Sequence, residues 1–313
     1  MEKDHGSEFP VIKGAWPDWW TFGASALDTA TTRLASSSLT ANEAGLSMAL
    51  IAGVKLPDDI NKCIDLTDNA LLFYTEHTLG YSESVREPLS QPTIEQRSLK
   101  ESYAWEANRR AASVGEEAMG LLQSKFNREG QPSLIVFNTL NWKRSGLATV
   151  YIDHQIVPRG KIAGIFDRDG NRLAVQPVLH RSDVTEWAIW VKDIPAFGYK
   201  KYIIKAIDDI RTTEENSNSK TLENQWYQIE TDPLKGSIKS WYDKELSTEL
   251  IDSKNQYKMG EFILEQLGNR SQMESRKLDD FKRSLLDTVW FDSMTKGEIW
   301  NSIRFYGESA TSE

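Results

Sequence analysis

Apolar residues recur at steps of three and four along three stretches in the first part of the chain. The stretches run over 27–50, over 60–74 and from about 93 to 121, and the second follows Pro57-Asp58-Asp59. This spacing places apolar side chains on one face of a helix. Proline tolerates the first helical turn, and acidic groups suit the positive end of the helix dipole. Three consecutive amphipathic helices predict a three-helix bundle over 27–129.

The pattern changes at 130–132, where short runs rich in β-branched and aromatic residues replace the helical spacing. These runs are 134–137, 147–152, 187–191, 199–205, 226–230 and 238–242. Turn sequences separate them, which is typical of antiparallel strands. Two polar stretches, 208–221 and 269–283, are predicted to be loops. The predicted fold class is therefore α+β and multidomain, with the three-helix bundle followed by an antiparallel β-sandwich over 130–313.

The first residues, 1–26, follow neither period. Aromatic residues stand among glycines and prolines over 9–23, and this composition predicts a loop that covers another part of the protein.

Charge and cysteine content exclude several classes of function. The chain has 46 acidic and 37 basic residues and a net charge of -9, so it offers no basic surface for nucleic acid. Its one cysteine, Cys63, allows neither an internal disulfide nor a thiolate metal cluster. The first residues do not resemble a secretion signal, and no run is long enough to cross a bilayer. We therefore expect a cytoplasmic protein without a membrane partner.

The chain has four histidines, and one of them is a candidate for chemistry. His5, His154 and His180 have no ligand-spaced partner and are interpreted as ordinary surface histidines. His77 lies in the polar segment 75–80, where the second helix is predicted to end. An imidazole there either binds a metal or a sugar, or caps the end of the helix, and the spacing alone favours the cap.

The segment Glu76-His77-Thr78-Leu79-Gly80 resembles the Glu-His-Thr-aromatic-Gly signature of bacterial members of glycoside hydrolase family 38, with Leu79 in place of the aromatic residue. Further similarity lies in 14–20, where Ala15 replaces an expected aspartate, and in 133–144, 194–200, 222–224 and 236–244. These matches follow the order of the family and cover nearly the whole chain. They indicate the last part of a catalytic domain, a helical middle domain and part of a β-sandwich region.

The resemblance implies a zinc-dependent, retaining α-mannosidase that acts on mannose-containing oligosaccharides. Retaining glycosidases use two carboxyl groups about 5 Å apart, one as nucleophile and one as acid and base. In the family the nucleophile and the first zinc ligands belong to an α/β domain that precedes the aromatic loop. No catalytic residue is therefore expected in this chain, which is interpreted as a fragment that is inactive alone, with 1–26 as the remnant of that domain and a truncated β region.

By the same resemblance His77 matches a ligand of Zn²⁺, and the aromatic loop lines the sugar pocket. Trp20 is the preferred sugar-stacking residue, followed by Trp19 and Trp16, and Asp18 lies in the same loop. We expect these tryptophans to be exposed where the α/β domain is missing. Two other functions stay open: a non-catalytic carbohydrate-binding or scaffolding module, and a structural protein that docks a partner through the aromatic loop.

Overall fold

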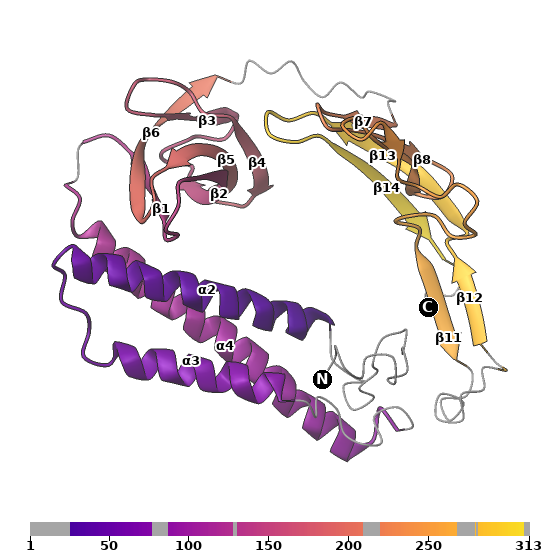
Figure 1. The fold of residues 1–313 in the computed structure, drawn as a ribbon, viewed down its shortest axis with the longest axis horizontal. Helices are drawn as coiled ribbons and strands as arrows, with labels where there is room; N and C mark the ends of the chain where they lie inside the picture. The colour runs from indigo at the N-terminus through magenta and orange to yellow at the C-terminus, as the bar shows by residue number, and fades with distance from the viewer. Residues whose placement is uncertain are drawn as a thin grey trace, which may run out of the picture. The chain divides into compact units, whose positions relative to one another are not determined.

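The structure is a computed structural model that describes residues 26–76, 87–127, 130–208, 220–267, 279 and 281–309 (Figure 1). The chain divides into two compact units between Phe126 and Asn127. The first contains helices and the second antiparallel strands, so the predicted α+β fold class is confirmed. Within the described residues, no helix has the length and apolar character needed to span a membrane.

The described part of the first unit contains three helices: α2 (Ala26–Ile51), α3 (Ile60–Thr75) and α4 (Gln91–Gln123). They lie side by side in Figure 1, and α4 packs against both of the others. The shared core is rich in alanine: it consists of Ala35, Leu39, Leu46, Ile60, Ala70, Ala107, Ala111, Val114 and Ala118. Small side chains allow the helix backbones to approach closely, so the bundle depends on tight packing.

Asn42 of α2 and Gly115 of α4 lie close together where these two helices pack. The Asn42 amide donates to the backbone oxygen of Ala111 at 2.8 Å. A Cβ at Gly115 would lie 2.8 Å from that amide nitrogen, closer than two such atoms normally approach. Glycine at this position therefore leaves room for a hydrogen bond between the two helices.

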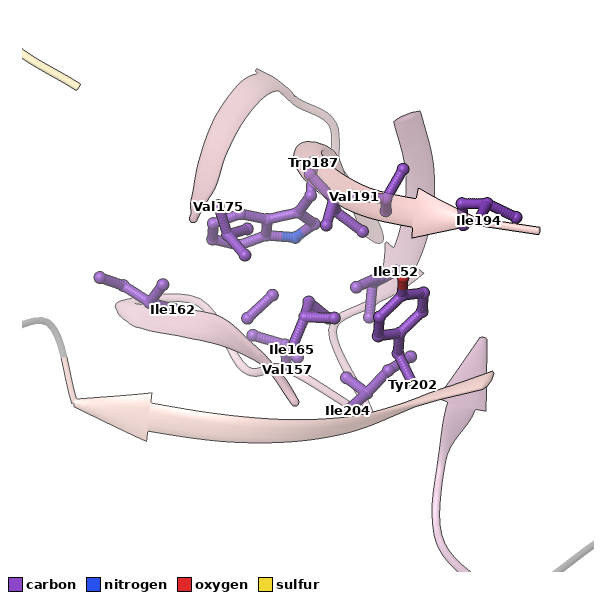
Figure 2. Close-up of a cluster of buried hydrophobic side chains, with 12 residues drawn as sticks. Ile152, Val157, Ile162, Ile165, Val175, Trp187, Val191, Ile194, Tyr202 and Ile204 are labelled. Atoms are coloured by element: carbon purple, nitrogen blue, oxygen red, sulfur yellow. The ribbon is translucent and has the colours of Figure 1, made fainter. Parts of the chain in front are cut away.

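The second unit begins with a small β-sandwich of two three-stranded sheets, ordered β1-β6-β3 and β2-β5-β4. The strands are β1 (Ser133–Asn138), β2 (Arg144–Asp153), β3 (Lys161–Phe166), β4 (Val175–His180), β5 (Val184–Ile194) and β6 (Gly198–Asp208). Side chains from both sheets meet in one core, shown in Figure 2, where Ile165, Trp187 and Tyr202 are among the buried residues.

Strands β3 and β4 were not predicted, and each contains a residue that is unusual in strands. Gly164 lies in β3, where an added Cβ would come within 2.9 Å of the Ile207 side chain on the neighbouring β6. Pro177 lies in β4, at the edge of its sheet. Edge strands tolerate proline because one of their sides has no neighbouring strand to bond. Both residues weaken the strand signal although the local packing accommodates them.

The remaining strands form a four-stranded sheet in the order β10-β9-β8-β7 and two hairpins. Their bounds are β7 (Thr221–Glu223), β8 (Tyr227–Asp232), β9 (Ser237–Asp243), β10 (Thr248–Glu249), β11 (Ile263–Leu267), β12 (Phe281–Leu285), β13 (Thr288–Thr295) and β14 (Ser302–Glu308). The prediction of a loop over 269–283 was wrong at its end, because β12 begins at Phe281 and pairs with β11. The charged residues of β12 are untypical of a strand. In the structure one of them, Arg283, donates to the Glu265 carboxylate on the paired strand.

Candidate functional site at the end of helix α3

The residues predicted to bind metal and sugar lie outside the described part of the structure. These are His77, Trp16, Asp18, Trp19 and Trp20; of the predicted 1–26 segment, the structure describes Ala26 alone. The predicted exposure of the tryptophans therefore stays a prediction. Glu76 is the described residue that directly precedes His77 in the sequence. The candidate site is therefore described from the end of α3.

Glu76 ends helix α3. Its backbone N–H still donates to Leu72 O at 3.0 Å, the bond expected in a helix, but its φ of -56° and ψ of 136° are extended. The change falls at a single residue. The direction in which the chain leaves the helix is therefore set by whatever holds Glu76.

Lys100 of α4 holds this corner. Its ammonium nitrogen lies 2.8 Å from Phe73 O, 3.4 Å from Glu76 O and 2.9 Å from the Glu76 carboxylate oxygen Oε2. Lys100 is only 8% exposed, and buried lysines are rare unless they are paired. One cation thus satisfies backbone carbonyls that α3 leaves open at its end and also fixes the side chain of the terminal residue.

Two further contacts hold the last turn of α3. The Tyr74 hydroxyl lies 2.9 Å from the Thr29 hydroxyl oxygen on α2, and Tyr74 is buried. The rings of Phe73 and Tyr103 stack with their centroids 5.3 Å apart. The beginning of α2, the end of α3 and the early part of α4 therefore meet around the residues that precede His77.

Charged side chains of α2 and α4 interact at this end of the bundle. The hydrogen bond from Arg97 of α4 to Glu101, at 2.5 Å, raises the pKa of Arg97, and the charge of Asp28 on α2, which is 4% exposed, adds to this shift.

The described residues do not make a metal site by themselves. Across the described ranges, His, Cys, Asp and Glu side chains form no group of three or more that is placed to hold a metal ion. Tetrahedral zinc sites need three or four protein ligands. A zinc site at the end of α3 would therefore need at least one ligand from outside the described part.

Comparison with known proteins gives a match in fold but none in sequence. No family model matches the sequence, and no curated protein matches it. The structure is similar to that of a protein in glycosyl hydrolase family 38 from Enterococcus faecalis, with a TM-score of 0.58 and 12% sequence identity. The similarity covers 95% of this chain and 38% of that chain. The chain has the fold of part of a family 38 protein.

A second similar structure is that of an alpha-mannosidase from Enterococcus faecalis V583, with a TM-score of 0.48, 13% identity, and coverage of 92% of this chain and 38% of that one. The similarity in fold is shown by the first of these two structures. In both cases this chain spans well under half the length of the solved protein. The resemblance predicted from the sequence motifs is thus confirmed at the level of the fold.

Two segments of the β unit that resemble family 38 motifs form structural corners. The amide nitrogen of Asn138 donates to Trp142 O at 2.7 Å, Pro195 O at 3.0 Å and Ile194 O at 3.3 Å, and Asn138 is 2% exposed. Phe197, with a φ of 47°, donates its N–H to Leu140 O at 2.8 Å. The motifs 133–144 and 194–200 therefore bind each other where β1 leads to β2 and β5 leads to β6.

Sequence reasoning missed a relation between two histidines of the β unit. His154 Nε2 and His180 Nδ1 each lie 3.0 Å from the hydroxyl oxygen of Thr185, which is 3% exposed. The pairing of β2 with β5 and of β4 with β5 brings them to this hydroxyl. The two histidines are far apart in sequence. Only the register of the paired strands would have predicted that they share this hydroxyl.

Proposed function

We propose that this chain is part of a zinc-dependent, retaining α-mannosidase of glycoside hydrolase family 38. The observation that carries the proposal is the fold similarity to a family 38 protein over 95% of this chain. It agrees with motifs that occur in the order of the family, including Glu76-His77 at the end of α3. The substrate that follows from this proposal is an oligosaccharide with α-linked mannose.

In this proposal the chain supplies part of the active site. His77 contributes one zinc ligand, and Trp20, Trp19 and Trp16 offer flat apolar faces for a pyranose, next to Asp18. Zinc, when bound, holds sugar hydroxyl groups and stabilises developing charge. The role of the described residues is positional, because Lys100 fixes the backbone at Glu76, one residue before the ligand.

The two carboxyl groups of the retaining reaction are assigned to an α/β domain outside these 313 residues. The basis is the family resemblance together with the 38% of the solved family 38 protein that this chain covers. That domain is then the main partner of this chain.

Hydrolysis of an aryl α-mannoside by the purified chain, with zinc added, tests the assignment of the carboxyl groups. We expect no turnover above that of buffer with zinc. Robust turnover that is lost on removal of zinc would place the nucleophile within these residues and contradict the division proposed above.

Calorimetric titration with mannosides distinguishes the enzyme fragment from a non-catalytic carbohydrate-binding module. In the enzyme fragment, any binding of mannosides depends on the aromatic loop and is weakened by Trp20→Ala. Binding that is lost on changes in the β unit and is untouched by both Trp20→Ala and His77→Ala would favour the module instead.

A further inference from the structure

A hollow of about 490 Å³ lies in the β unit, between the turn before β3 and the hairpin turn that joins β4 to β5. Its volume falls in the range of small-molecule sites. Arg159 and Lys161 line it from the first turn, and His180 and Arg181 line it from the second. Thr185 and Trp187 of β5 belong to its wall.

The walls of the hollow are held together without a ligand. The Arg159 guanidinium Nη2 donates to Arg181 O at 2.9 Å and to Ser182 O at 3.0 Å, so it connects one turn to the other. The first turn is closed by a hydrogen bond from Lys161 N to Pro158 O at 3.0 Å. The two turns are therefore already ordered before a ligand binds. This lowers the entropic cost of binding.

The charge of the lining is opposite to the charge of the chain. Arg159, Lys161 and Arg181 line the hollow, no carboxylate is among its lining residues, and the chain as a whole carries -9. Lys161 pairs with Asp208, whose side chain is 83% exposed, and such surface pairs are weak and exchangeable. In the described parts of the chain, no carboxylate forms an ion pair with Arg159 or Arg181.

His180 and Trp187 complete the wall of the hollow. The indole N–H of Trp187 is buried and has no hydrogen-bond partner, and an indole can only donate. His180 is oriented by its Nδ1 contact with the buried Thr185 hydroxyl. Three cationic side chains that line one space, with an imidazole beside them, match an anion with oxygen acceptors on several sides.

We propose that this hollow binds a small tetrahedral oxyanion, a phosphate group, either as free inorganic phosphate or as the ester of a sugar phosphate. The proposal does not depend on the mannosidase assignment, because every residue in it belongs to the β unit and none belongs to the site at the end of α3.

Calorimetric titration of the full chain tests the proposal with inorganic phosphate, mannose 6-phosphate and methyl α-mannoside as separate ligands. We expect the two phosphates to bind and the neutral mannoside not to bind. Arg181→Ala should weaken phosphate binding about tenfold or more, since it removes a charge-assisted contact. Lys161→Ala should weaken it in the same direction, and is the second variant if Arg181→Ala does not fold.

Arg168→Ala is the matched control. Arg168 is exposed, carries the same charge, and follows the far end of β3, which starts at Lys161 and ends at Phe166. Its loss should change affinity less than about twofold, because exposed charges beyond a Debye length are screened. Equal weakening by Arg168→Ala and Arg181→Ala would show a diffuse charge effect and overturn the proposal, as would equal binding of the neutral mannoside.

The two phosphate ligands identify the source of the anion. Tighter binding of mannose 6-phosphate than of inorganic phosphate assigns the hollow to a sugar phosphate, with contacts to the sugar as well. Equal or tighter binding of inorganic phosphate assigns it to the free anion. Absence of binding by both phosphates contradicts the proposal.

Discussion

The two units of the protein each contain a buried side-chain nitrogen that donates to several acceptors at a turn of the chain. In the β unit it is the amide of Asn138, with three carbonyl oxygens as acceptors. In the helical unit it is the ammonium of Lys100, with two carbonyl oxygens and the Glu76 carboxylate. The two corners solve the same problem, because backbone carbonyls at a change of direction lose their regular partners.

The chemistry of the two donors differs, and the difference indicates what each corner does. Asn138 is neutral, 2% exposed and lies in a segment whose residues bind one another, so its role is architectural. Lys100 carries a charge near the edge of the bundle, where its partner Glu76 is partly exposed and directly precedes His77. A charge costs more to bury than an amide. Under the proposed function, this cost falls where the backbone leads to His77.

Asn138→Ala tests the architectural corner and should have the largest effect. It leaves the carbonyls of Trp142, Ile194 and Pro195 without their donor, and the free energy of opening of β1 and β6 should fall by about 3 kcal/mol. Hydrogen exchange of the amides in these strands measures it. Asn141→Ala, in the same motif but exposed, should change it by less than about 0.5 kcal/mol. An equal effect of both changes would contradict the role given to Asn138.

Lys100→Met removes the charge at the second corner while it keeps much of the apolar stem. The last turn of α3 should lose about 2 kcal/mol of protection, less than a fully buried pair would, because Glu76 is partly exposed. Faster hydrogen exchange at Tyr74, Thr75 and Glu76 than in the native chain is the expected result. Lys62→Met, on the exposed side of α3, is the control and should leave this exchange unchanged.

Asn42 and Gly115 give a smaller effect that depends on both residues. Asn42→Ala loses one hydrogen bond between helices and should cost about 1 kcal/mol. Gly115→Ala in the native chain pushes the Asn42 amide away, whereas in Asn42→Ala it should stabilise the helix by about 1 kcal/mol. Denaturation of the four variants in a double-mutant cycle measures the coupling. Additive effects would show that a Cβ at position 115 does not contact the Asn42 amide.

The smallest expected effect is a pH dependence in the hairpin of β9 and β10. The hydrogen bond from Ser240, together with backbone N–H groups of Ile251 and Trp241, lowers the pKa of Glu249 below its ordinary value of 4.5. A lowered pKa stabilises the folded hairpin above pH 4.5, and this contribution is lost as the pH falls through the folded value. NMR titration of Glu249 should show the low pKa, and Ser240→Ala should raise it.

Much of the fold was predictable because local patterns and tertiary packing agree. The helix predicted over 27–50 is α2 (Ala26–Ile51), and the strand predicted over 199–205 is β6 (Gly198–Asp208). Where packing overrides local preference, prediction failed, as it did at Gly164 in β3 and Pro177 in β4. Each is accommodated by neighbours that are distant in sequence, and single-residue preferences contain no information about them.

The candidate site was predictable only in part. His77 stays a prediction from a motif, and the motif does not indicate what holds the preceding residue, Glu76. A lysine in an amphipathic helix is normally interpreted as exposed, whereas Lys100 is buried against the end of another helix. The basic hollow was missed for the same reason, because Arg159 and Arg181 meet through strand pairing and not through sequence spacing.

The central proposal is that His77, the residue that follows the corner held by Lys100, is a zinc ligand of a family 38 α-mannosidase. The most direct measurement is the zinc content of a polypeptide that joins this chain to a family 38 α/β domain, compared between the native sequence, His77→Ala and His154→Ala. The account predicts stoichiometric zinc in the native protein and in His154→Ala, and its loss in His77→Ala. Full zinc occupancy in His77→Ala would contradict the account.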